Sequence, residues 1–139
     1  MPVGSVVDKG TVEGYPVMVR RGGLPCVLCG YVGVPRGHPD YGASMEILED
    51  ELAVHGGVTW ADGVHDGDGW QWAWAGDVWW IGFDCGHYDD IEFDVGSRTS
   101  IRSNKDAAFV RAEIRALAAQ LKARERPKLE ENHEEVQTD

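Results

Sequence analysis

The sequence predicts one α+β domain, in which an antiparallel β-sheet carries a C-terminal α-helix on one face and a disordered acidic tail follows. Short segments rich in β-branched and aromatic residues, separated by Gly and Pro, fill roughly the first hundred positions. An alanine-rich amphipathic segment comes after them. With 139 residues, the chain is long enough for one core and too short for two. We therefore assign residues 1–126 to the domain and residues 127–139 to the tail.

The strand candidates follow one another along the chain. Residues 15–20 carry β-branched and aromatic side chains and end at a Gly-containing turn signal. Residues 26–34 are predicted to form a second strand. The two prolines and two glycines of residues 35–42 predict an irregular loop. Short strands are also expected at residues 52–55 and 58–61.

A hairpin is predicted from residues 70–74 and 78–83, which flank a short Ala-Gly-Asp connection. The tryptophans of the first strand alternate at period two, so their indoles share one face. That face is either an aromatic platform for a base, sugar or peptide, or part of the core. Residues 91–103 are predicted to be a polar connection.

The last regular element is a helix over residues 104–124. Its large apolar residues recur at helical spacing, and the alanines between them favour a helix. Ser103 gives a weak N-cap signal, and Pro127 is expected to end the helix. The thirteen residues from Pro127 onward include five acidic side chains, a composition typical of a disordered tail. The apolar positions of the helix are Val110, Ile114, Leu117 and Leu121.

The charge balance limits the classes of partner. The formal net charge is −11, which repels phosphate backbones, so we do not expect nucleic-acid binding. No apolar stretch approaches the roughly 20 residues that cross a bilayer, and the N-terminus lacks a secretory signal. We therefore expect a cytoplasmic protein with reduced thiols and no membrane partner. The acidic surface suits either solubility or the recognition of a basic partner.

The most informative motif is Cys85-Gly86-His87, because it ends a run of bulky apolar residues over positions 79–83. Such a run predicts a buried strand. Its end would place Asp84, Cys85 and His87 at the rim of the sheet, where binding and catalytic groups often lie. The motif predicts a site without naming a reaction.

One candidate metal site is a structural zinc site. Cys26 and Cys29 have the two-residue spacing of zinc ligands, and Cys85 with His87 would complete a Cys₃His set. However, positions 26 and 29 of a regular strand point to opposite faces, so this site requires a turn there. The alternative is that these cysteines are small buried residues.

A second candidate metal site consists of His55, Asp84 and His87, with Asp90 near a bound water. Mixed nitrogen and oxygen ligands leave a position open for water, which suits a metal-dependent hydrolase. Alternatively, His55 is an ordinary hydrogen-bonded histidine. In a further alternative Cys85 is a nucleophile paired with an imidazole, although the nearby carboxylates raise the pKa of a thiol. Whether the chain is an enzyme stays open at this point.

Residues 30–39, 54–59 and 79–87 form an ordered series of motifs. They read Gly-Tyr-Val-Gly-Val-Pro-Arg-Gly-His-Pro, Val-His-Gly-Gly-Val-Thr and Trp-Trp-Ile-Gly-Phe-Asp-Cys-Gly-His. Together they resemble a group of small uncharacterised proteins encoded by bacteriophages and prophages. The resemblance implies a phage origin and no particular activity. Its pattern centres on His38, His55, Asp84, Cys85 and His87, and it does not include Cys26 and Cys29.

These observations lead us to expect a phage-encoded accessory protein in the host cytoplasm that binds a host factor or a small molecule. One alternative is a metal-dependent hydrolase, and another is an acidic inhibitor of a host DNA-binding or defence protein. Zinc is the candidate cofactor, with His55, Asp84 and His87 as its ligands. A covering loop is expected to complete the binding site. The expected ligand-binding residues are His55, Asp84, Cys85, His87, His38 and Arg36.

Overall fold

A computed structural model describes most of the chain. In its last segment the side chains are described through Glu125, and beyond that residue only the backbone is described. The strands at 91–93 and 101–103 are likewise described by their backbone alone. The described segments are residues 6–22, 27–63, 76–86, 91–93, 101–103 and 105–138.

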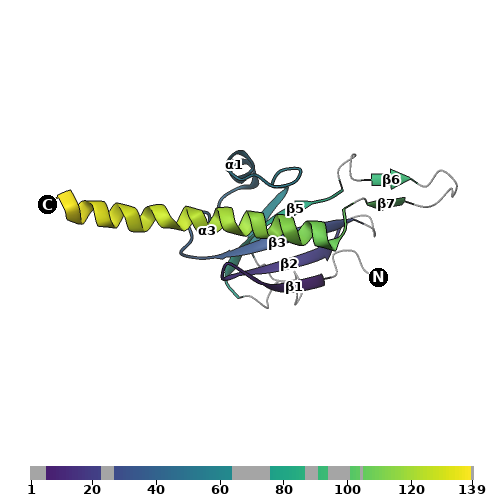
Figure 1. The fold of residues 1–139 in the computed structure, drawn as a ribbon, viewed down its shortest axis with the longest axis horizontal. Helices are drawn as coiled ribbons and strands as arrows, with labels where there is room; N and C mark the ends of the chain where they lie inside the picture. The colour runs from purple at the N-terminus through teal and green to yellow at the C-terminus, as the bar shows by residue number, and fades with distance from the viewer. Residues whose placement is uncertain are drawn as a thin grey trace.

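Five strands form one antiparallel sheet: Val6–Val12 (β1), Tyr15–Arg21 (β2), Leu28–Pro35 (β3), Trp60–Gly63 (β4) and Val78–Asp84 (β5). Their order in the sheet is β1-β2-β3-β5-β4, and Figure 1 labels β1, β2, β3 and β5. β1 and β2 are joined by a two-residue turn at Glu13 and Gly14, both with positive φ, which is the geometry of a tight β-hairpin. Among the described strands β1 pairs only with β2, so it is an edge strand.

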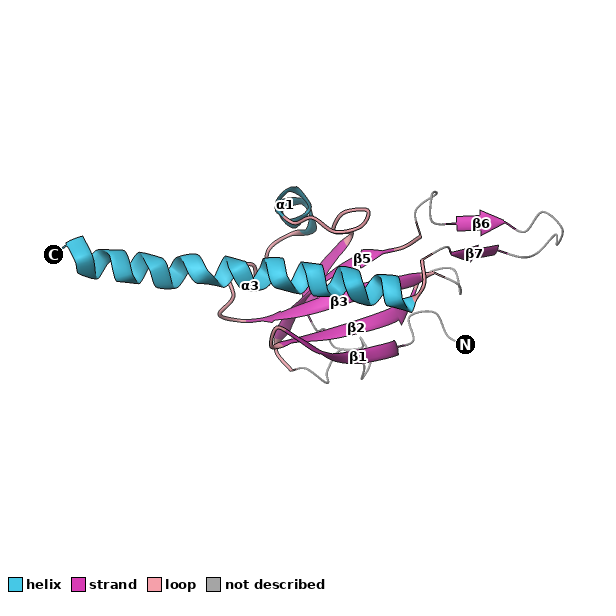
Figure 2. Cartoon of the chain, in the orientation of Figure 1, coloured by secondary structure: helices cyan, strands magenta, loops and turns pink. Residues whose placement is uncertain are grey.

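The helix α3 (Ala107–Thr138) lies across one face of this sheet, as Figure 2 shows. Its predicted apolar stripe is buried, because the stripe packs on the side chains that β2, β3 and β5 point toward it. The arrangement confirms the predicted α+β class and the predicted helix. The helical members of this core are Val110, Ile114, Leu117, Ala118 and Leu121.

Two glycines in the middle of the sheet each lie opposite an aromatic residue of the neighbouring strand. Gly30 pairs with Phe83, and Tyr31 pairs with Gly82. A Cβ atom added to Gly30 would lie 2.6 Å from the Phe83 ring, and one added to Gly82 would collide with the Tyr31 ring. The two rings therefore cover glycine backbone, Phe83 on the α3 face of the sheet and Tyr31 on the other.

The region of residues 44–55 differs from its prediction. A helix that the sequence analysis missed, α1 (Met45–Glu51), begins after the N-cap residue Ser44, whose side chain accepts a hydrogen bond from the Ile47 N–H. The strand expected at residues 52–55 does not form. Its backbone groups bond instead to side chains of α3, which replace a neighbouring strand.

The segment before α3 also needs correction. Within residues 91–103, predicted as a polar connection, two short strands pair with each other: β6 (Ile91–Phe93) and β7 (Ile101–Ser103). Ser103 lies in β7 and is not the N-cap. Asp106 takes that role, because its carboxylate accepts a hydrogen bond from the Phe109 N–H at 2.9 Å. The predicted strand at 70–74 lies outside the described residues.

The helix α3 does not end at Pro127, where the sequence analysis placed its end. It continues to Thr138 and passes the edge of the sheet (Figure 1). Proline lacks an N–H group, so Pro127 costs the helix one backbone hydrogen bond. Residues 127–138 continue the helix, where a disordered tail was expected. Within the described residues, no helix combines the length and the apolar character that a membrane crossing requires.

Candidate functional site

The three motifs of the sequence analysis meet in the sheet. Residues of the first motif form β3, which pairs with the β5 residues of the third. The second motif ends beside them, where the Thr59 N–H donates to the Gly82 carbonyl at 2.9 Å. The backbones therefore converge, but the expected site side chains that the structure describes do not gather in one place.

Asp84 and Cys85 point to opposite faces at the end of β5. Cys85 is fully buried in the core beneath α3, and its N–H donates to the Leu28 carbonyl at 3.0 Å. Asp84 is the register partner of Cys29, so both lie on the face that α3 does not cover. One Asp84 oxygen accepts a hydrogen bond from the Gly86 N–H at 2.8 Å. Neighbouring positions in a strand alternate, which separates these two predicted site residues.

The same alternation separates the cysteines of the alternative zinc site. Burial, together with the Asp84 charge, raises the pKa of the Cys29 thiol to about 11. Because Cys29 and Cys85 lie on opposite faces, this geometry does not let them ligate one ion. Cys26 and His87 lie outside the described residues. Within the described part, no group of three or more His, Cys, Asp or Glu side chains is arranged to hold a metal.

His38 is buried under the end of the packed helix. Its Nδ1 accepts a hydrogen bond from the Asp40 N–H at 2.9 Å, and its Nε2 lies 2.7 Å from the Leu121 carbonyl oxygen. The first contact requires Nδ1 to be bare, so Nε2 carries the proton and donates to Leu121. The Tyr15 ring meets the imidazole edge-on. His38 thus uses both nitrogens inside the fold and ties its loop to α3.

Two further side chains of the same turn of α3, Arg124 and Glu125, make polar contacts with the rest of the domain. The Arg124 guanidinium donates to both oxygens of Asp40, at 2.6 and 2.8 Å, and also to Glu51 at 2.6 Å. The Tyr15 hydroxyl donates to the Glu125 carboxylate, and this hydrogen bond lowers the pKa of Glu125. Burial and the same carboxylate raise the pKa of Tyr15. We call these contacts, together with those of His38, the helix anchor; its residues are Tyr15, His38, Asp40, Glu51, Leu121, Arg124 and Glu125.

His55 contacts α3 at a different place. Its backbone N–H donates to the Glu113 carboxylate at 2.8 Å. Its ring packs edge-on against the Phe109 ring, with the two ring centroids 5.0 Å apart. Glu113 and Leu121, the helix partners of His55 and His38, are eight residues apart. Eight residues span about 12 Å along a helix, so the two histidines do not share a site.

Arg36 lies at the surface of the loop after β3. It pairs with Asp77 at 2.8 Å and lies over the Tyr41 ring, while the Tyr41 hydroxyl donates to the same carboxylate at 2.6 Å. These two hydrogen bonds lower the pKa of Asp77. Arg36 therefore links its loop to Asp77, just before β5. It shares no contact partner with His38 or His55 among the interactions described above.

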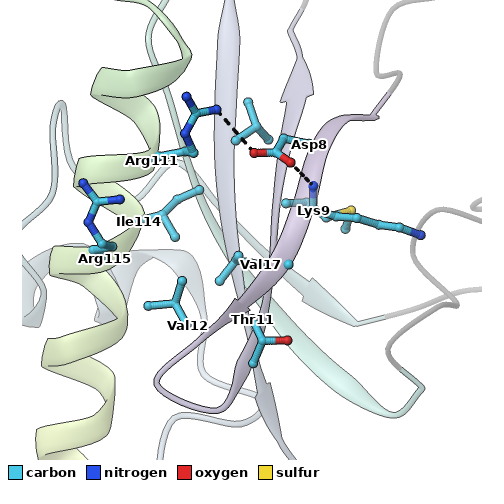
Figure 3. Close-up of a pocket in the computed structure, with 11 residues that line it drawn as sticks. Asp8, Lys9, Thr11, Val12, Val17, Arg111, Ile114 and Arg115 are labelled. Carbon is cyan, nitrogen blue, oxygen red and sulfur yellow. Dashed lines mark hydrogen bonds and ion pairs between the residues drawn. The ribbon is translucent and has the colours of Figure 1, made fainter.

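The structure reveals a different candidate site, a hollow between β1 and α3 that the sequence analysis missed (Figure 3). Arg111 and Arg115 lie at its rim, and Val12, Val17 and Ile114 line it. The sequence contains one signal for it, because two arginines four positions apart lie on one side of the helix, next to the apolar stripe. We call this hollow the β1–α3 groove.

No protein-family model matches the chain, and no curated protein or solved structure is significantly similar to it. The geometry of the described residues is therefore the basis for inferring its function. That geometry offers a firmly anchored helix that continues past the sheet and a groove beside the helix.

Proposed function

We propose that this protein is a phage-encoded accessory protein that binds a basic surface of a host protein through the acidic C-terminal end of α3. The supporting observation is the helix anchor. It ties α3 to the rest of the domain at Leu121, Arg124 and Glu125, in the last turn whose side chains are described. Its contacts fix the direction in which the helix leaves the sheet.

The charge of the chain supports the same function. Residues 126–139 contain five acidic and two basic side chains, in a protein of formal net charge −11. An acidic segment held on a helix of fixed direction attracts a basic surface at long range and loses little conformational entropy on binding. The phage origin rests on the motif resemblance, and a host protein follows from it as the class of partner.

The alternatives receive less support from the geometry. A metal-dependent hydrolase would need His55 and Asp84 together with His87. Of these, His55 packs against Phe109 of α3, whereas Asp84 lies on the face of the sheet that α3 does not cover. The binding cluster expected from the motifs divides between the two faces in the same way. We therefore propose the acidic helix end as the binding element.

The test is a charge-neutral tail in the full-length chain. In one variant Glu130, Glu131, Glu134 and Glu135 are changed to Gln; the matched control neutralises the exposed residues Glu13, Glu46, Glu49 and Asp50, which removes the same number of charges. Host proteins captured by the intact chain are identified, purified and titrated against both variants.

The proposal expects a partner whose affinity falls at least tenfold for the tail variant, stays within about twofold for the control, and weakens with added salt. Equal losses in the two variants would mean a nonspecific response to net charge. A partner that binds the tail variant normally would contradict the proposal.

A further inference from the structure

The β1–α3 groove is a shallow apolar hollow of about 160 Å³. Figure 3 shows Val12 and Val17 of the sheet and Ile114 of the helix arranged around it, with Arg111 and Arg115 on the helix side. α3 packs mainly over β3 and β2, so the edge strand β1 extends beyond its cover. The groove is the corner that this offset leaves open.

The depth of the groove depends on a glycine. Gly10 pairs with Val17, on the side of β1 that faces the helix. A Cβ atom placed on Gly10 would meet no heavy atom within 4 Å, so the space above it is open. Any larger residue at this position would occupy that space. The sequence therefore keeps the groove empty at the point where a strand residue would ordinarily fill it.

The rim of the groove is cationic in an otherwise acidic protein. Arg111 Nη1 lies 3.3 Å from Asp8 Oδ2, and both side chains of this ion pair are about half exposed. Arg115, one turn further along the helix, is exposed and makes no hydrogen bond or ion pair with any residue that the structure describes. Like charges four residues apart disfavour a helix, and a bound anion between them relieves this repulsion.

We propose that the β1–α3 groove binds a small organic monocarboxylate, with the carboxylate on Arg115 and Arg111 and an apolar body on Val12, Val17 and Ile114. The planar guanidinium matches a carboxylate through two parallel hydrogen bonds. The apolar lining of the groove favours a ligand with an organic, apolar part, because an inorganic anion would leave this lining in contact with water. Pockets for drug-sized ligands measure roughly 300–1,000 Å³, so this smaller groove selects a small acid.

This site is separate from the acidic end of α3 and needs no partner protein. Two sets of variants test it: one removes the positive charge of Arg115, and the other fills the open volume above Gly10. Arg115→Gln removes the unpaired cation, and Lys122→Gln removes an exposed cation from the same helix away from the groove as a matched control. Gly10→Leu fills the groove, and Gly10→Ala fills it only in part, which keeps the test valid if the larger residue impairs folding.

The measurement is an NMR titration of the full-length protein with three probes: benzoate, benzyl alcohol and inorganic phosphate. We expect saturable shifts at residues of β1 and α3 with benzoate, and binding at least tenfold weaker with the other two. Arg115→Gln should weaken benzoate binding roughly 10-fold to 100-fold, the range for loss of a charge-assisted hydrogen bond. Lys122→Gln should leave it within about twofold.

The Gly10 variants should weaken benzoate binding in the order of their size, with Leu abolishing it. Equal binding of benzyl alcohol or of phosphate would overturn carboxylate recognition. Equal effects of Arg115→Gln and Lys122→Gln would show a response to net charge alone. Unchanged binding in both Gly10 variants would place the ligand outside the groove. None of these outcomes depends on whether the acidic tail binds a host protein.

Discussion

The two flanks of α3 differ in how their polar groups are satisfied. On the flank of residues 38–55, side chains of the helix bond to backbone and carboxylate groups of the loop: Gln120 bonds both the N–H and the carbonyl of Ala53, and Arg124 holds Asp40. On the flank of β1, Arg111 has one half-exposed pair with Asp8, and Arg115 bonds to none of the described residues.

The difference shows which part of the helix serves the fold and which is left for a ligand. On the flank of residues 38–55 the polar side chains of His38 and Asp40 are buried. Buried polar groups stabilise only when every partner is present. The flank of β1 leaves cations and apolar surface accessible, and this costs little stability because water still solvates the charges. Substitutions on the two flanks should therefore differ in effect, and the following predictions test that.

The largest expected effect is at His38. Replacement by Leu leaves the Asp40 N–H and the Leu121 carbonyl without their imidazole partner, in a place where His38 is 5% exposed. The Asp40 N–H is then unsatisfied, which costs about 1–3 kcal/mol, and the Leu121 carbonyl, which lies inside α3, loses its second hydrogen bond. We therefore expect a loss of about 3 kcal/mol in the free energy of unfolding, measured in urea. A loss below about 1 kcal/mol would show that water reaches these groups, and the flank would not be closed.

A matched pair of substitutions compares the flanks directly. Asp40→Asn removes the charge that Arg124 binds at a 4%-exposed position, and we expect a loss of about 2 kcal/mol. Asp8→Asn removes the partner of Arg111 at the half-exposed pair and should cost less than about 0.5 kcal/mol. Both are measured by urea unfolding at neutral pH. Similar losses of unfolding free energy in the two variants would contradict the proposed difference between the two flanks of α3.

The contact between Tyr15 and Glu125 should make the anchor sensitive to acid. The folded-state pKa of Glu125 is depressed by the Tyr15 hydrogen bond. Its contribution is therefore present above the unfolded pKa of about 4.3 and is lost as the pH falls through the folded pKa. We expect Tyr15→Phe to cost about 1 kcal/mol at neutral pH.

That cost should shrink when the same urea titrations are repeated at successively lower pH, as the Glu125 carboxylate becomes protonated. A difference between wild type and Tyr15→Phe that is constant with pH would show that the hydroxyl contributes through packing and not through the carboxylate.

The last expected effect is small and has the opposite sign. Gly10→Ala adds a methyl group in open space, at a position without positive φ, and should stabilise the protein by about 0.5 kcal/mol by restricting the unfolded chain. Gly14→Ala is the control, because its φ of 84° strains any other residue, and it should destabilise. Thermal unfolding of both variants checks this. Destabilisation by Gly10→Ala would mean that the groove is already filled.

Local sequence patterns predicted much of the fold. Residues 15–20 and 78–83 form strands, and the apolar stripe of α3 is buried, because strand and helix periodicity act within a few residues. The contacts that join α3 to residues 38–55 were not predictable in this way. Ala53 and Gln120 are 67 positions apart, and a side chain that bonds a distant backbone leaves no periodic signal. The strand predicted at residues 52–55 failed for that reason.

The candidate site was harder to predict than the fold. Asp84 and Cys85 were grouped because they are adjacent in sequence, but adjacent residues of a strand point to opposite faces. His38 was expected to bind a ligand because it belongs to the first motif and to the covering loop, yet both of its nitrogens bond within the protein. The groove depends on the absence of a side chain at Gly10, and an absence carries weak sequence information.

In β3 and β5, a glycine of each strand lies opposite an aromatic residue of the other strand. This pairing limits how the sheet can evolve. Gly30 is covered by Phe83, and Gly82 by Tyr31, in adjacent pairs on opposite faces. A larger residue at either glycine is tolerated only if the opposing ring shrinks at the same time, so each pair is inherited as a unit. Homologous chains should show these positions changing together, and the Gly-Tyr and Gly-Phe elements of the first and third motifs then record packing in the sheet.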